Sequence, residues 1–175
     1  MQLNRLPSGG RIDRSKPLSF RFNGRKLTGY AGDTLASALL ANGVTLVGRS
    51  FKLHRPRGIV GAGAEEPNAI MQVGKGAHTE PNLRATQVEL YEGLVARSTK
   101  GWPGIQFDLG SINNLLSRVF GAGFYYKTFM RPMSWWPFYE RFIRASAGFG
   151  TAPKEPDPDE YEQQNAHCDV LVAGG

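Results

Sequence analysis

The stretch LSFRFNGRKLTGY, residues 18–30, contains two short runs in which apolar and polar side chains alternate, and Asn23-Gly24 separates them. Alternation with a period of two is typical of a strand with one buried face. Asn-Gly suits a two-residue hairpin turn because both residues tolerate a positive φ. The sequence therefore predicts a β-hairpin over residues 18–30.

A short helix is expected directly after this hairpin. Asp33 precedes an apolar stripe that includes Leu35 and Leu39, and Gly43 follows the stripe. We therefore predict a helix that is capped by Asp33 and ended by Gly43. Further short strands are predicted at residues 45–47, 69–73 and 86–90. A hairpin, one helix and more strands form a β-grasp order, which places the front of the chain in the α+β class.

The connection from residue 48 to residue 68 is rich in cations and longer than the ~12 to 15 residues usual for a structureless loop. Arginine suits carboxylate and phosphate groups, so we predict contacts with an anion or an acidic partner, with a solvated basic loop as the alternative. The residues predicted to make these contacts are Arg49, Lys52, Arg55 and Arg57. His54 is predicted to be a hydrogen-bonded structural residue, because no carboxylate or nucleophile lies near it in the sequence. We predict no catalytic residue.

Composition and charge limit the class of protein. The 175 residues are 41% apolar, which is enough for one compact domain with extensions. The net charge of +6 is uneven, because residues 1–60 carry eleven Lys or Arg against two Asp, and the remainder carries ten against thirteen acidic residues. No nucleic-acid motif accompanies the basic part, so we expect no nucleic acid partner. The sequence holds no signal peptide, no apolar run of ~20 residues and one cysteine, Cys168, which predicts a soluble cytoplasmic protein without membrane contact.

The second half of the chain is rich in aromatic residues. Helices are expected at residues 108–120, begun by Ser111, and at residues 134–147. The aromatic tract from Phe124 to Phe142 has the composition of buried interface anchors, packing either within the chain or on another subunit. Binding to a membrane surface is a weaker alternative, because the tract has few cations.

The C-terminal residues are expected to open a dinucleotide-binding domain. Residues 170–172 (Val-Leu-Val) form the apolar run of a buried parallel strand, and Gly174 and Gly175 are predicted as cofactor-binding residues of the turn after it. The helix that would hold the phosphate lies outside the sequence, so we expect the chain alone not to bind a dinucleotide tightly. We interpret the chain as the front of a longer flavoenzyme subunit, with a glycine-rich end after any core strand as the alternative.

Five parts follow from these patterns. They are an N-terminal tail (1–16), a β-grasp domain (17–100), an aromatic-rich helical extension (101–150), a proline-rich acidic linker (151–166), and the first strand and glycine turn of a truncated Rossmann-type domain (167–175).

Several stretches of unusual composition resemble the alpha subunits of heterotetrameric sarcosine oxidases. They are residues 32–44 (GDTLASALLANGV), 48–59 (GRSFKLHRPRGI), 65–69 (EEPNA), 81–86 (PNLRAT), 122–130 (AGFYYKTFM) and 168–172 (CDVLV). The resemblance implies a ferredoxin-like β-grasp domain at the front of the chain. It also implies a complex that oxidatively demethylates sarcosine to glycine, acting on the CH-NH group of the donor with oxygen as acceptor.

The resemblance further implies the cofactors and partners of such a complex. The cofactors are FAD, covalent FMN, NAD and tetrahydrofolate, with zinc on a small subunit. The partners are the beta, gamma and delta subunits and the remainder of the alpha subunit. We expect this chain to hold none of the cofactors alone and to be inactive by itself.

A related branch, of the opine oxidase type, carries a two-iron cluster on the same kind of domain. Plant-type spacing C-x4-C-x2-C with a distant fourth cysteine would place the ligands near Val60, Glu65, Asn68 and Thr86. None of these residues is a cysteine, so we predict no metal site and no iron-sulfur cluster, and we interpret the domain as a structural or assembly module. The alternatives are an anion- or flavin-phosphate-binding module and a ferredoxin-like electron-transfer domain.

Overall fold

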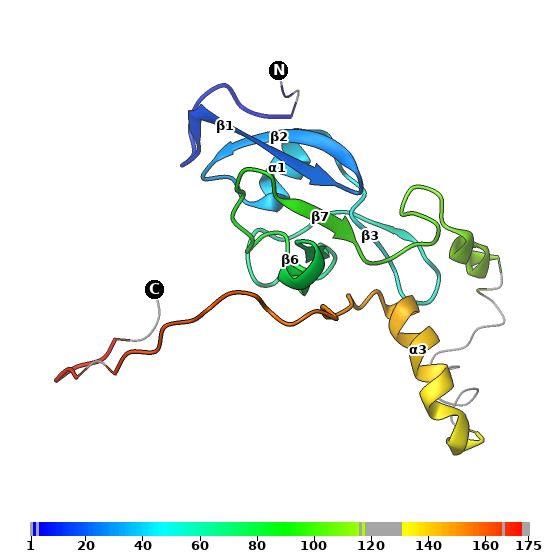
Figure 1. Ribbon diagram of the computed structural model, residues 1–175. Coiled ribbons are helices and arrows are strands. Elements are labelled where there is room, and N and C mark those ends of the chain that lie inside the picture. The colour runs from blue at the N-terminus through cyan, green and yellow to red at the C-terminus, as the bar shows by residue number, and fades with distance from the viewer. Residues whose placement is uncertain (1, 3, 116, 118–130, 166, 173–175) are drawn as a thin grey trace.

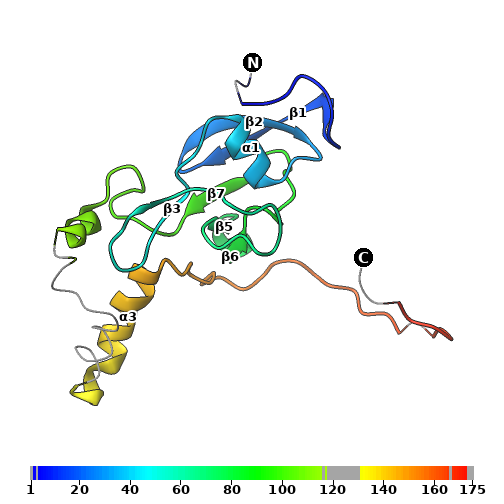
Figure 2. The ribbon, with the colours of Figure 1, turned by 180° about the vertical axis from the view of Figure 1, so that it is seen from behind.

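A five-stranded mixed sheet forms the body of the protein. The computed structural model describes residues 2, 4–115, 117, 131–165 and 167–172. The elements of the body are β1 (Asp13–Phe22), β2 (Arg25–Ala31), α1 (Leu35–Ala41), β5 (Ile70–Val73), β6 (Glu80–Arg84) and β7 (Val95–Ser98). The strand order is β2-β1-β7-β5-β6, and α1 lies against one face, as the two opposite views in Figures 1 and 2 show. One mixed sheet with few helices agrees with a ferredoxin-like domain.

The hairpin predicted over residues 18–30 is confirmed. β1 and β2 pair in antiparallel fashion, and Asn23 and Gly24 form the turn with φ values of 47° and 81°. Phe20 and Phe22 of β1 are buried, as the alternating pattern requires. β1 begins at Asp13, so the strand starts within the stretch that the sequence predicts as tail.

The N-cap of α1 is Thr34 and not Asp33, so that prediction is wrong. The Thr34 hydroxyl accepts the Ser37 N–H, and the Ser37 hydroxyl accepts the Thr34 N–H, which forms a capping box. The Asp33 carboxylate instead accepts hydrogen bonds from Arg5 Nη2 (2.7 Å) and the Tyr30 N–H (2.9 Å). Asp33 is buried, so this ion pair fastens the N-terminal residues to the start of α1.

The end of α1 agrees with the prediction. Asn42 is the C-cap, and Gly43 follows it with a φ of 74°. A positive φ directly after the helix is the conformation that glycine adopts without steric cost.

One of the three further predicted strands is confirmed, because β5 lies within residues 69–73. Residues 86–90 form no strand, since their backbone bonds to the start of α1: the Leu35 N–H donates to Val88 O (2.8 Å) and the Leu90 N–H donates to Asp33 O (2.9 Å). Residues 45–47 also form no strand, and pairing begins at the following residue. The two strands there are β3 (Gly48–Arg49) and β4 (Pro56–Arg57).

The central strand β7 has no counterpart in the sequence prediction. It runs parallel to β1 and antiparallel to β5, so it joins the hairpin to the second half of the sheet. Its four residues, VARS, are too few for a pattern of period two to stand out.

The core between the sheet and α1 is apolar. Its buried members are Phe20, Phe22, Leu27, Leu35, Ala36, Ala38, Leu39, Val44, Val47, Ala69, Met71, Val73, Ala85, Leu90, Leu94 and Ala96.

The remaining helical elements connect the strands or follow the last strand. They are the 3-10 helices η1 (Gly76–His78), η2 (Leu109–Asn114) and η3 (Met133–Trp135), and the α-helix α3 (Trp136–Ala147). α3 confirms the helix predicted at residues 134–147, whereas the described part of 108–120 holds the shorter η2. Figure 1 shows α3 extending away from the sheet, and the chain after it passing below β6 in this view. No helix in the described part of the chain is long and apolar enough for a membrane span.

Candidate functional site

The first part of the predicted basic loop is an ordered hairpin. Gly48 pairs with Arg57 between β3 and β4. At the tip, the His54 N–H donates to Ser50 O (3.1 Å) and the Ser50 N–H donates to Arg55 O (2.9 Å). His54 has a φ of 51°, which closes the tip. The cations predicted to contact an anion are therefore held on a defined backbone.

The Arg49 guanidinium is directed toward another segment of the same chain. Its Nε donates to Ile105 O (2.8 Å), its Nη1 to His54 O (2.9 Å) and its Nη2 to Gln106 O (3.2 Å). Nε also lies 3.6 Å from Asp108 Oδ2. Each guanidinium nitrogen has a protein acceptor, so Arg49 fastens the hairpin to residues 105–108.

A histidine-carboxylate pair lies beside Arg49. His54 Nδ1 is 2.6 Å from Asp108 Oδ2, and the side chain of Asp108 is 1% exposed. The other carboxylate oxygen accepts the N–H groups of Trp102 (3.0 Å) and Gly110 (3.1 Å). The structure thus supports a structural role for His54. The sequence shows no carboxylate near His54, but the fold brings the Asp108 carboxylate into contact with its ring. Asp108 lies 54 residues further on, where spacing analysis has no signal.

The charge state of Asp108 fits this role. Burial would raise the pKa of its carboxyl, but the hydrogen bonds from Trp102, His54 and Gly110 outweigh burial and hold the pKa below its ordinary value. The carboxylate therefore remains negative beside Arg49. We call Arg49, His54 and Asp108 the loop clamp. An imidazole that is oriented by a carboxylate can also act as a general base. The His54 ring, however, lies directly against Gly110, where an added Cβ would be 2.3 Å from the ring. The clamp is therefore packed as a structural unit.

The other predicted cations lie apart from Arg49. Arg55 is exposed, and its Nε lies 3.2 Å from Asn114 Oδ1. Arg57 is exposed near Lys100, whose ammonium pKa is lowered by burial and by the Arg57 charge. The backbone carbonyl of Lys52 accepts a hydrogen bond from Asn113 Nδ2 (3.5 Å). The structure therefore turns Arg49 inward and leaves Arg55 and Arg57 exposed on the hairpin.

The second part of the loop surrounds a carboxylate that the sequence analysis did not select. Glu66 is fully buried, and its two oxygens accept four backbone N–H groups of the same loop. The donors are Val60, Gly61, Asn68 and Ala69. The loop closes against the body where Thr86 Oγ1 donates to Gly63 O (2.8 Å). No local pattern distinguishes Glu66 from its exposed neighbour Glu65.

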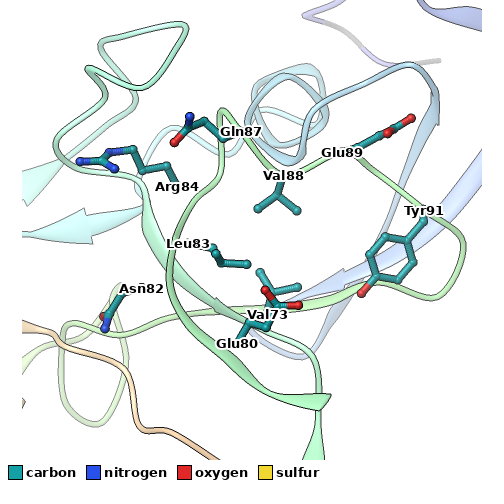
Figure 3. A pocket seen from close by; sticks show the side chains of 9 residues that line it. All are labelled: Val73, Glu80, Asn82, Leu83, Arg84, Gln87, Val88, Glu89 and Tyr91. Carbon is teal, nitrogen blue, oxygen red and sulfur yellow. The ribbon is translucent and has the colours of Figure 1, made fainter. Parts of the chain in front are cut away.

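A shallow cavity of about 430 Å³ lies between β6 and the segment that follows it (Figure 3). Figure 3 shows the apolar side chains of Leu83 and Val88 directed toward its middle, and the carboxylates of Glu80 and Glu89 at separate places on its rim. No sequence prediction points to this cavity. Its separated rim charges do not converge on one position, so the arrangement does not define a catalytic centre.

One group of described residues has the spacing of a metal site. His78, Asp157 and Asp159 place one ligand atom each within 4.8 Å of one another. All three are exposed, and Asp157 already accepts the Tyr161 hydroxyl (2.6 Å). Exposed acidic groups are common without a bound ion, so we assign no metal to this group.

The described part of the aromatic tract is exposed. Trp135, Trp136, Phe138 and Phe142 are 57%, 43%, 58% and 61% exposed, and none of the residues of α3 is buried. Phe138 and Phe142 lie edge to face, with ring centroids 5.1 Å apart. These rings form an apolar surface on α3 rather than part of the core. The predicted anchors between Phe124 and Met130 lie outside the described residues.

The C-terminal prediction is only partly covered by the structure. Residues 170–172 are described, and they form an exposed extended segment without strand pairing. The expected buried strand is therefore not formed in this chain, because a parallel strand needs neighbouring strands for its backbone groups and the described residues provide none there. Gly174 and Gly175 lie outside the described residues.

Comparison with known proteins shows what the chain is similar to. Residues 15–101 match a family described as 2Fe-2S iron-sulfur cluster binding domain. The sarcosine oxidase subunit alpha of Rhizobium meliloti (strain 1021) is 61% identical over 175 residues, covering 99% of this chain and 18% of that protein. The sarcosine oxidase subunit alpha of Corynebacterium sp. (strain U-96) is 44% identical over 170 residues, covering 95% of this chain and 13% of that protein. The chain is homologous to the N-terminal region of sarcosine oxidase alpha subunits.

The homology confirms the resemblance found in the sequence, and the chain spans less than a fifth of the length of these relatives. The chain also has a structural likeness to the L-proline dehydrogenase of P. horikoshii, with 23% sequence identity over 49% of this chain and 16% of that chain. The TM-score of 0.36 is too low to support an inference.

The iron-sulfur group named by the matching family does not fit the residues of this domain. Two-iron clusters are held by four thiolates, or by two thiolates and two histidines. The one cysteine of the chain, Cys168, lies outside residues 15–101 and is exposed. The residues near the four positions that plant-type spacing indicates are Val60, Glu65, Asn68 and Thr86. The backbone N–H groups of two of them bond to Glu66, and the Thr86 hydroxyl bonds to the loop itself.

Proposed function

We propose that this chain is the N-terminal scaffold module of a sarcosine oxidase alpha subunit and does not carry out the chemistry itself. The observation that carries the proposal is the homology over 99% of the chain to a protein of which the chain spans 18%. The mixed sheet and single packed helix are consistent with a ferredoxin-like β-grasp domain, and the unsuitable ligand positions argue against electron transfer through a cluster.

The full enzyme would oxidatively demethylate sarcosine to glycine in the cytoplasm. Its cofactors would be FAD, FMN, NAD and tetrahydrofolate, held by the remainder of the alpha subunit and by beta, gamma and delta subunits. Residues 167–175 would open the dinucleotide-binding domain of the alpha subunit, with Gly174 and Gly175 at its phosphate turn. Residues 170–172 would then find the neighbouring strands that an apolar run of this kind needs.

The exposed aromatic face of α3 supports the scaffold role. Large exposed apolar patches on soluble proteins mark contact surfaces, and aromatic residues are typical anchors of such contacts. Trp135, Phe138 and Phe142 would pack on another part of the complex. The loop clamp would keep residues 102–114, which precede this region, fixed to the β3–β4 hairpin.

The proposal is tested by assembly in trans. The remainder of the alpha subunit is co-expressed with the beta, gamma and delta subunits, with and without this chain. Complex formation is followed by size-exclusion chromatography and activity by sarcosine-dependent oxygen consumption. We expect the chain alone to show no turnover and the assembled complex to require the chain. Turnover by the chain alone, or full assembly and activity without it, would contradict the scaffold role.

A further inference from the structure

Glu66 is a buried carboxylate whose charge is met by backbone groups. Its Oε2 accepts the N–H groups of Val60 (2.7 Å) and Gly61 (2.5 Å), and its Oε1 accepts those of Asn68 (2.7 Å) and Ala69 (3.2 Å). The residue is 0% exposed. Burying a carboxylate is costly unless hydrogen bonds replace its hydration, and four donors on two oxygens provide that replacement.

No ion pair contributes to this arrangement within the described part of the chain, where no side-chain nitrogen of Lys, Arg or His lies within 4.0 Å of a Glu66 carboxylate oxygen. Burial would raise the pKa of Glu66, but the N–H groups of Gly61, Asn68, Val60 and Ala69 outweigh it and lower the pKa. Converging backbone N–H groups form the type of concave anion site known as a nest. The loop from residue 60 to residue 69 thus has the geometry of an anion site, with a side chain of its own as the anion.

The nest lies in the stretch where plant-type spacing, laid after Gly58, would place metal ligands. This spacing puts ligands near Val60, Glu65 and Asn68, and two of these residues donate their N–H groups to Glu66. The fourth position, Thr86, bonds to Gly63 O in the same loop. In a cluster-bearing loop, backbone N–H groups would face the sulfur atoms, whose hydrogen bonds tune the cluster.

We propose that the loop of residues 60–69 is an anion-binding nest in which the Glu66 carboxylate occupies the position of the anionic cluster and its thiolates. The inference rests on the proposed scaffold function, because it explains how the loop keeps its shape without metal. It predicts that an external carboxylate of the same size binds in the nest once the Glu66 side chain is removed.

The packing around the nest limits what else fits. A Cβ at Gly61 would meet the Glu65 carboxylate at 3.0 Å and the Glu66 backbone at 3.2 Å, so the loop is wound tightly at this point. Truncating Glu66 to alanine removes a CH₂-COO⁻ group, which has nearly the shape of acetate. Acetate is therefore the matched probe, and acetamide is its neutral counterpart.

The experiment compares the full chain carrying Glu66→Ala with the full chain carrying Glu65→Ala. Glu65 is the neighbouring residue of the same type, and it accepts the Ala62 and Gly63 N–H groups on the exposed side of the loop. We expect Glu66→Ala to lower the urea midpoint of unfolding by roughly 1 M or more, because four backbone N–H groups lose the buried carboxylate that accepts them. The change for Glu65→Ala should stay within about 0.3 M.

Rescue provides the specific readout. Acetate should raise the midpoint of Glu66→Ala with saturation, whereas sodium chloride of equal ionic strength and acetamide should not. The wild-type chain should not respond to acetate, since its own carboxylate fills the nest. An equal response of both proteins, or a midpoint of Glu66→Ala equal to that of Glu65→Ala, would overturn the proposal.

A measurement on the wild-type chain covers the case in which Glu66→Ala does not fold. In a pH titration followed by NMR, the amide protons of Val60, Gly61 and Asn68 should shift together with the Glu66 carboxyl carbon, below the pH range of ordinary glutamates. Independent titration of these signals would refute the nest. Iron analysis of the same sample tests the scaffold function separately, because bound iron would contradict that function whatever acetate does.

Discussion

Removing the Asp108 carboxylate should loosen the contact of residues 102–114 with the β3–β4 hairpin while leaving the sheet folded. In Asp108→Ala, the N–H groups of Trp102 and Gly110 lose an acceptor at 3.0 and 3.1 Å, and His54 loses its partner at 2.6 Å. Arg49 keeps its three carbonyl acceptors but loses the neighbouring charge. The segment is therefore loosened and not fully released.

The size of the effect follows from these contacts. Hydrogen bonds to a charged group contribute about 1.5–3 kcal/mol each, but the segment lies at the surface and water replaces part of the loss. A total of about 3 kcal/mol is the expected cost to local stability. Since 1.4 kcal/mol corresponds to about a tenfold change in an equilibrium constant, the segment should open roughly 100-fold more often.

Native-state hydrogen exchange measures this opening directly. The Leu109 amide, which donates to Trp102 O at 2.8 Å, reports on the segment, and the Arg21 amide, which donates to Leu94 O at 2.8 Å, reports on the sheet. Exchange at Leu109 should become roughly 100-fold faster and exchange at Arg21 should change little. Asp108→Asn should give a smaller increase, because the amide oxygen still accepts an N–H group. If the Leu109 amide exchanges at the wild-type rate in Asp108→Ala, the clamp does not hold the segment.

Three further predictions concern the same surface and the aromatic helix. Because the pKa of Asp108 is lowered in the folded protein, its stabilisation of the segment is complete above about pH 5 and is lost as the pH falls below the ordinary pKa of 3.8. Exchange of the Leu109 amide, corrected for its intrinsic pH dependence, should show this loss. The same pH profile in Asp108→Asn would contradict the role of the Asp108 charge. Gly110→Ala places a Cβ 2.3 Å from the His54 ring and should cost about 1–3 kcal/mol of local stability. Gly104→Ala is the matched control, because a Cβ there would have nothing within 4 Å. Equal exchange of the Leu109 amide in the two variants would exclude this steric argument. Phe142 is exposed, so Phe142→Ser should leave the urea midpoint of the chain unchanged but reduce capture of the chain by the remaining subunits at least tenfold. Arg141→Ser on the same helix is the control. Unchanged capture of Phe142→Ser would show that Phe142 is not part of the contact surface.

Local patterns in the chain were sufficient for several elements. The alternation around Asn23-Gly24 determines the hairpin, because the turn geometry depends on these two residues alone. Gly43 ends α1 for an equally local reason. The helix cap was misplaced by one residue, since Asp33 has a distant partner, Arg5, that competes for its carboxylate. Strand β7 was missed because it is held by neighbours on both sides and not by its own composition.

The sequence by itself determined the hairpin, the helix, the similarity to sarcosine oxidase alpha subunits and the lack of cysteines near the cluster positions, because each depends on residue type or on spacing along the chain. The tertiary structure decided which charges meet. Among the described residues it alone brings Asp108 to His54 across 54 positions and buries Glu66 while leaving Glu65 in water. The physical reason is that a buried carboxylate needs several donors at once, and only the folded backbone gathers them around one point.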